Sequence, residues 1–291
     1  MQNWLTMWIH EFLVDFVAGL FAGVLSNIDS QVSYAGTQLA QSPMAWGGGS
    51  AGSIVQSLAS TVIPPIAGII LAYVMCWELI QMLTDSNVVE SFELKHLFVY
   101  IAKMVIAVFL ATNAWTIVMG MFDVAGWLIG NAAGHIGSEV VPTFGEIRSA
   151  LEESDIPALL SLMGVLFLLN LGMPIMTIII LIIVWGRMME ILVAASAAPI
   201  PLATLMQRDL SSIGQNYLKY LAALGFQGFI IMVCLAIYTA IFSGLITAPP
   251  GGGLTAGDVG SWAWRVAAVN ALLVFMLIKS GGVAKTIFNT H

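Results

Sequence analysis

Charged residues are scarce in this sequence. Only 9% of its 291 residues are Asp, Glu, Lys or Arg, whereas 59% are hydrophobic. A soluble domain carries about 25% charged residues, which keep its surface compatible with water. The scarcity therefore excludes an ordinary soluble fold and indicates a surface that lipid covers.

Basic residues are few, and no run of them occurs. The nine Lys and Arg residues are scattered, and the formal net charge is −7. Proteins that coat nucleic-acid phosphates concentrate positive charge on one face. The sequence therefore argues against a dedicated nucleic-acid-binding surface.

The residues and motifs that carry enzyme chemistry are also missing. Cys76 and Cys234 fall inside apolar runs, and none of the four histidines has a second ligand at metal spacing. The sequence lacks H-E-x-x-H, G-x-S-x-G, P-loop and G-x-G-x-x-G motifs. We therefore expect no enzymatic activity, no metal and no cofactor.

What the sequence contains is a series of long apolar runs. A run of about 20 apolar residues crosses about 30 Å of hydrocarbon as a helix, which satisfies its own backbone hydrogen bonds. The sequence predicts an all-α, polytopic transmembrane protein with about five spans. These lie at residues 58–83, 97–122, 157–186, 217–247 and 262–280, and the second can continue helically to Gly134.

Residues 1–53 precede the predicted transmembrane domain of residues 54–291. Apolar residues recur in pairs every four positions near the start, which is typical of a one-sided helix. Two acids in the first half of this stretch make it a poor deep span. We expect an amphipathic interfacial helix over residues 3–28 and a polar linker over residues 26–53. An ordinary first span is the alternative.

Residues 187–209 are too short and too rich in proline for a comfortable span, and predict a re-entrant or interfacial segment. If they do not cross, five spans place the N-terminus outside and the C-terminus in the cytoplasm. The positive-inside rule supports this orientation. The inner side then holds Lys95, Lys103, Arg187, Arg208, Lys219, Lys279 and Lys285, and the outer side holds Arg148 and Arg265.

Charged side chains near or within spans are the candidate functional residues, because such groups are costly in lipid. Arg187 and Glu190 stand three positions apart, so one helix face can pair them, as a structural ion pair or as a lining or partner contact. Lys103 is close enough to the inner end of its span to reach the interface. Asp123 is either solvated at the outer interface or a lining residue. For Glu78, near a span end, solvation is expected.

Small residues predict close helix packing. Gly126, Gly130 and Gly134 occupy successive i+4 positions, which lets helices approach closely in lipid. Packing within the chain and contact with another subunit explain this ladder equally well.

Several patterns occur in order between about residue 70 and residue 291. They are ELIQMLTD at 78–85, ATNAWTIVM at 111–119, FDV at 122–124, RMME at 187–190, APIP at 198–201, QNYLKY at 215–220, GFQG at 225–228 and IKSGGVAKTIFN at 278–289. With these patterns the chain resembles the TrbL-like polytopic inner-membrane subunits of type IV secretion systems, in the compact form of Gram-positive conjugative elements.

The resemblance implies a membrane channel or scaffold subunit that supports transfer of a DNA–protein substrate. It implies a ring-like homo-oligomer in the inner membrane, beside the secretion ATPases and the coupling protein. Nucleic acid would be transient cargo only. A small-solute transporter or permease subunit is the alternative, because Pro174 and the Pro199–Pro201 stretch can break helices near the midplane. A non-transporting assembly anchor is a third possibility.

Overall fold

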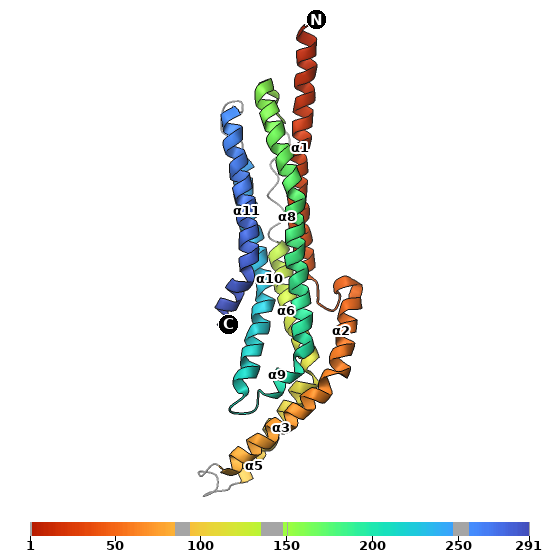
Figure 1. Ribbon diagram of the computed structural model, residues 1–291, viewed down its shortest axis with the longest axis vertical. Helices are drawn as coiled ribbons and strands as arrows, with labels where there is room; N and C mark the ends of the chain where they lie inside the picture. The colour runs from red at the N-terminus through yellow and green to blue at the C-terminus, as the bar shows by residue number, and fades with distance from the viewer. Residues whose placement is uncertain (1, 85–93, 135–147, 150, 247–255, 291) are drawn as a thin grey trace. The chain divides into compact units, whose positions relative to one another are not determined.

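The computed structural model describes residues 2–84, 94–134, 148–149, 151–246 and 256–290. Over these residues it is built from helices and contains no strand, which confirms the all-α prediction. The helices are α1 (Gln2–Ala40), the 3-10 helix η1 (Trp46–Gly49), α2 (Ser50–Thr61), α3 (Ile63–Thr84), α5 (Leu94–Thr112), α6 (Ala114–Gly134), α8 (Ile156–Ala197), α9 (Pro199–Ala203), α10 (Ser211–Ile246) and α11 (Ala256–Ile287) (Figure 1).

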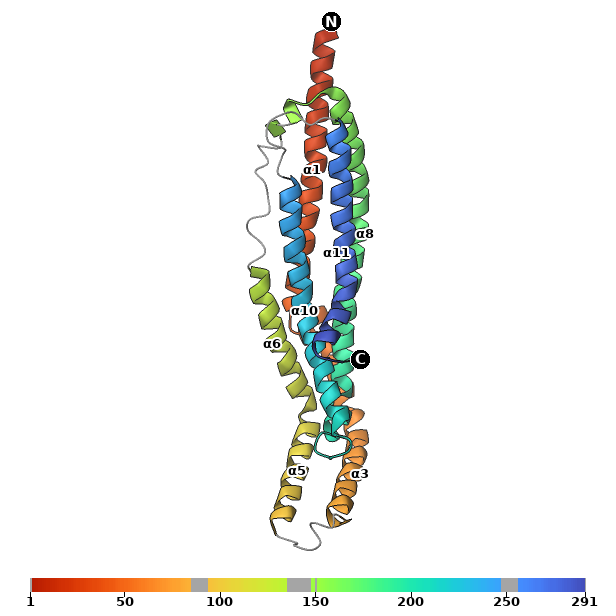
Figure 2. The same ribbon diagram turned by 90° about the vertical axis from the view of Figure 1, so that its left-hand side faces the viewer.

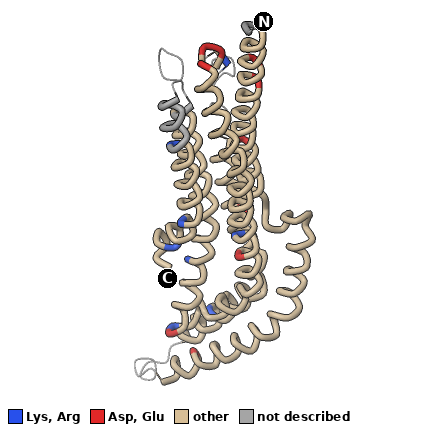
Figure 3. The backbone as a smooth tube through the Cα atoms, turned by 45° about the horizontal axis from the view of Figure 1, so that its top comes forward, with Lys and Arg blue, Asp and Glu red and all other residues tan. Residues whose placement is uncertain are grey.

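Seven candidate membrane spans occur in the described part of the chain, judged by helix length and composition. They are Trp4–Ala40, Ile63–Thr84, Leu94–Thr112, Ala114–Gly134, Ile156–Ala203, Ser211–Gly244 and Arg265–Ile287. The polytopic prediction is confirmed, although its count of about five is lower than seven. The two additional candidates are α1 and α6. Acidic and basic positions are sparse along all of these helices (Figure 3).

Helix α1 is longer than the predicted interfacial helix, and its apolar residues are not confined to one face. Trp8 and Phe12 are exposed, whereas Val17 and Val24 are buried. Buried apolar positions continue beyond residue 28 to Leu39 at helical spacing. Residues 26–40, which we expected in the polar linker, are therefore helical because they carry a packing face of their own.

Helices α5 and α6 are separated by Asn113 alone. The hydroxyl of Thr112 donates to the carbonyl of Val108 at 2.8 Å, and the amide of Asn113 donates to the carbonyl of Phe109 at 3.0 Å. Side chains that bond back to carbonyls of the preceding turn compete with the backbone and bend helices. The helix predicted to continue from residue 97 to Gly134 thus continues, with an interruption between its two halves.

The residues between Arg187 and Asp209 form three successive parts. The first continues α8 to Ala197, the second is α9, and the third is a turn that leads into α10 at Ser211. Pro199 stands at the start of α9, where a missing N–H costs least. Pro174 lies inside α8 without ending it.

The chain divides into two compact units. The first contains residues 1–39, 129–184 and 229–280. Within it the amide of Asn170 on α8 donates to the carbonyl of Leu20 on α1 at 3.0 Å, and the hydroxyl of Tyr238 on α10 donates to Asn270 on α11 at 2.6 Å. Polar side chains inside an apolar bundle thus connect its helices.

The second unit contains residues 40–128, 185–228 and 281–291. Its core is made by apolar side chains of α6, the end of α8, α9 and the start of α10, among them Phe122, Met188, Leu202 and Leu221. Helices α3 and α5 lie side by side (Figure 2) and both contact α9. Of the residues of α5, only Ala107 is buried.

Gly126 permits a close backbone approach within this second unit. A Cβ built on it would lie 2.9 Å from the carbonyl oxygen of Ala40, at the end of α1. We expect Gly126→Ala to lower the free energy of unfolding by about 1–3 kcal/mol, as overpacking does where backbone must shift. Unfolding of the purified protein in detergent by heat or denaturant measures the change.

Gly120→Ala is the matched control, since it lies on the same helix with nothing within 4 Å of a built Cβ. Alanine is a better helix former than glycine by about 1 kcal/mol, so stability should be kept or raised. Equal destabilisation by both substitutions would contradict the packing role of Gly126.

Candidate functional site

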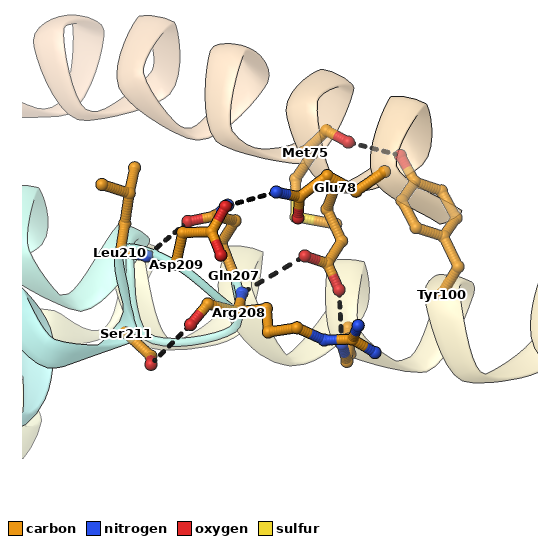
Figure 4. Close-up of polar contacts among 10 residues, drawn as sticks. Met75, Glu78, Tyr100, Gln207, Arg208, Asp209, Leu210 and Ser211 are labelled. Carbon is orange, nitrogen blue, oxygen red and sulfur yellow. Dashed lines mark hydrogen bonds and ion pairs between the residues drawn. The ribbon is translucent and has the colours of Figure 1, made fainter. Parts of the chain in front are cut away.

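A cluster of polar side chains joins α3, α5 and the turn between α9 and α10 (Figure 4). At its centre is Glu78, which is 8% exposed. Lys103 donates its Nζ to Oε1 of Glu78 at 2.5 Å, and the backbone N–H of Arg208 donates to Oε2 at 3.3 Å. Both carboxylate oxygens are therefore occupied by groups from other parts of the chain.

The turn is tied down by further hydrogen bonds. Gln81 on α3 donates its amide to the carboxylate of Asp209. Gln207 is fully buried, and its Oε1 accepts from the backbone N–H of Leu210 at 2.6 Å. The hydroxyl of Tyr100 on α5 donates to the carbonyl of Met75 on α3 at 3.2 Å. These bonds fix both helices and the turn around Glu78.

The electrostatics of this cluster depend on the burial of Glu78. Removing an unpaired carboxylate from water costs several kcal/mol or more, so a buried carboxylate requires a cation and hydrogen-bond donors. Lys103 is a third exposed, so it keeps partial hydration while its ammonium group compensates the carboxylate. The main effect of the pair is therefore to fix the position of α5 along α3. Its net contribution to stability is the smaller effect, because desolvation offsets the attraction.

Arg187 and Glu190, which we expected on one helix face, have separate partners. Arg187 is buried and donates to the carbonyls of Leu224 at 3.2 Å and Gly225 at 3.3 Å. Glu190 accepts from the hydroxyl of Tyr220 at 2.7 Å and lies 3.9 Å from Nζ of Lys285. Arg187 thus holds α8 against α10, and Glu190 adds the end of α11 to the same unit.

The other predicted residues are more dispersed. Asp123 is exposed on α6. Among the glycines, Gly126 is buried, whereas Gly130 and Gly134 are exposed. Lys103 is the predicted residue that the structure brings into the cluster, and Glu78 is its partner there.

From the sequence we expected Glu78 to be solvated, because it lies near a span end. The structure shows it buried and paired with Lys103. A usable signal existed. Glu78 lies six residues before the end of α3 and Lys103 nine residues after the start of α5. Opposite charges at similar depths on consecutive helices are placed to meet.

Within the described residues, no group of three or more His, Cys, Asp or Glu could hold a metal ion.

A second group of polar residues lies in the first unit. Arg148 pairs with Asp15 at 2.8 Å and with Glu152 at 3.1 Å, and His10 Nε2 lies 2.9 Å from the carbonyl oxygen of Ser154. The hydrogen bond with Glu152, together with the negative charge of Asp15, raises the pKa of the Arg148 guanidinium above its ordinary value. All three charged side chains are more than half exposed, so this group contributes little energy.

These observations define a polytopic helical membrane protein whose described polar groups mainly fix helices against one another. The chain belongs to the family described as TrbL/VirB6 plasmid conjugal transfer like protein, whose match covers residues 28–199, more than half of the sequence. This confirms the resemblance to TrbL-like subunits of type IV secretion systems. Searches of curated proteins and of solved structures gave no significant match.

The ion pair at the centre of the cluster can be tested by a double-mutant cycle. Lys103→Met leaves a buried carboxylate without its cation, so we expect the free energy of unfolding to fall by about 1–3 kcal/mol. Adding Glu78→Gln removes the stranded charge, so the double variant should be more stable than Lys103→Met alone. Denaturant unfolding in detergent is measured for Lys103→Met, for Glu78→Gln and for the double variant.

Arg148→Gln serves as the control, because its exposed ion pairs should be dispensable and its stability unchanged. Strict additivity of Lys103→Met and Glu78→Gln would show that the pair does not couple α3 to α5.

Proposed function

We propose that the chain is a membrane channel or scaffold subunit of a conjugative type IV secretion system, supporting transfer of a DNA–protein substrate. The observation that carries this proposal is membership of the TrbL/VirB6 family over residues 28–199. The family match includes α3, α5, α6 and all of α8, and thus both Glu78 and Lys103.

The composition of the chain suits such a role. A conduit or scaffold should let a nucleoprotein pass without binding it tightly, and tight binding needs many Lys and Arg contacts to phosphates. Nine scattered basic residues in an acidic chain supply no such surface. Nucleic acid is accordingly proposed as transient cargo only.

A homo-oligomer, ring-like in arrangement, is part of the proposal. Helix α5 supports it, because large apolar side chains such as Phe98, Val105 and Phe109 are exposed along it. An apolar helix with a single buried residue must be covered by lipid or by another subunit. Secretion ATPases and the coupling protein are proposed as further partners on the cytoplasmic side.

The proposed orientation keeps the N-terminus outside and the C-terminus in the cytoplasm. The five crossings expected from the sequence place the two termini on opposite sides. The distribution of Lys and Arg then decides between the two directions. We infer that Arg187, Glu190 and Lys103 hold helices together, and that Asp123, exposed on α6, is the better candidate for a lining or partner contact.

Transfer by the conjugative element that encodes this chain tests the function. Deleting the gene without disturbing its neighbours should abolish conjugation, and supplying the wild-type chain in trans should restore it. The transfer frequency in a mating assay is the readout. Undiminished transfer, with loss of uptake or export of a small solute instead, would favour the transporter alternative.

The oligomer is tested by the native mass of the full chain in mild detergent. We expect a discrete multiple of the 31.1 kDa subunit. Val105→Trp on α5 should lower the oligomeric fraction by crowding the proposed interface. Val193→Trp is the control, because Val193 is exposed to a similar extent on α8. A particle that is monomeric at every concentration would contradict the proposed ring-like homo-oligomer.

A further inference from the structure

A cavity of about 140 Å³ opens beside the Glu78 cluster and has no role in the proposed function. Its polar lining is Glu78, Gln81, Lys95, His96, Tyr100, Lys103 and Arg208. One ordered water needs only about 10–15 Å³ of such space, so the cavity can hold a larger group. We propose that it binds the headgroup of an anionic glycerophospholipid, with the phosphate on its cationic side and headgroup hydroxyls on Gln81 and His96.

The charge of the lining selects an anion. Three of the lining residues, Lys95, Lys103 and Arg208, are cations, and Glu78 is the single carboxylate among them. Glu78 is already bound by the ammonium of Lys103 at 2.5 Å. Lys95 is exposed and forms no ion pair with any described residue. A phosphate diester carries the single negative charge that such a surplus accepts.

Two unsatisfied atoms indicate a ligand that also donates hydrogen bonds. Oε1 of Gln81 and Nδ1 of His96 are buried and have no hydrogen-bond partner in the described structure. Gln81 is oriented by the bond from its amide nitrogen to Asp209, which leaves the oxygen free to accept. In the tautomer with an unprotonated Nδ1, His96 accepts as well. The hydroxyls of a glycerol headgroup would satisfy both acceptors.

The surroundings favour a lipid over a soluble phosphate. The cavity lies between the last turns of α3 and the first turns of α5, both of which qualify as membrane spans. Headgroups lie at such span ends. Exposed apolar side chains lie on the same turns of these two helices, including Trp77 and Ile80 on α3 and Phe98 and Ile101 on α5. Acyl chains attached to a bound headgroup could therefore lie against apolar surface.

The experiment uses the full chain, delipidated in a neutral detergent, with lipid binding followed by native mass spectrometry and by the midpoint of thermal unfolding. Four probes are compared: phosphatidylglycerol, phosphatidylethanol, phosphatidylcholine and free glycerol 3-phosphate. Phosphatidylethanol has the same charge as phosphatidylglycerol but lacks the headgroup hydroxyls. We expect phosphatidylglycerol to bind most tightly, phosphatidylethanol less tightly, and the other two weakly or not at all.

Two variants separate the two halves of the site. Lys95→Gln should weaken the binding of both anionic lipids by about five-fold, which is the value of one basic residue near a headgroup. Lys219→Gln is the control and should leave binding unchanged, because Lys219 is also exposed but lies outside the cavity. His96→Phe should lower the preference for phosphatidylglycerol over phosphatidylethanol by about three-fold, the value of one hydrogen bond, and leave the binding of phosphatidylethanol unchanged.

Several results would overturn the proposal. Binding of glycerol 3-phosphate as tight as that of phosphatidylglycerol would assign the cavity to a soluble phosphate. Equal effects of Lys95→Gln and Lys219→Gln would show that lipid binding depends on general surface charge and not on the cavity. Binding of single-stranded DNA that Lys95→Gln abolishes, without lipid selectivity, would assign it to cargo. None of these results bears on the mating assay, so the proposed function stands or falls separately.

Discussion

In hydrocarbon no water is present to satisfy a backbone or side-chain polar group, so each must find its partner within the protein. This chain repeatedly meets the constraint with side chains that donate to backbone carbonyls of a neighbouring helix, which retain a second lone pair within the helical ladder. Examples are Tyr100 to Met75, Tyr217 to Ala194, Arg187 to Leu224 and Gly225, and Asn170 to Leu20. Helices that are otherwise smooth and apolar thereby obtain fixed contacts.

The same constraint explains what the sequence could reveal. Apolar run length indicated where long helices lie, because a helix that crosses lipid must be long and continuous: the predicted 58–83 overlaps α3 from residue 63, and the predicted 217–247 overlaps α10 up to residue 246. The partner of Arg187 could not be found in this way. Every helical residue offers a carbonyl, so only the packing of α8 on α10 decides which carbonyl it meets. The spacing of charged side chains suggested Glu190, three positions away, as the partner of Arg187.

The sequence predicts about five spans, whereas the described residues contain seven candidates, and this difference has a related cause. Acidic residues near the start of α1 suggested a helix that stays at the interface, yet Asp15 is paired with Arg148 from a distant segment. A partner from elsewhere in the chain compensates part of such a charge, and a single sequence does not show that contact. The interruption at Asn113 similarly arises from two side chains that bond to their own helix, a local effect that the apolar pattern conceals.

The hairpin of α3 and α5 depends on its polar contacts more than other parts of its unit do. Because Ala107 is the only buried residue of α5, little apolar area holds this helix to α3 and α9. Elements with few buried contacts lie at the low end of local stability. Moving α5 away would leave Glu78 and Lys103 unpaired in a poorly hydrated environment, which is far costlier than exposing apolar side chains to lipid. The ion pair therefore sets the docked arrangement of a helix that hydrophobic packing alone would hold only weakly.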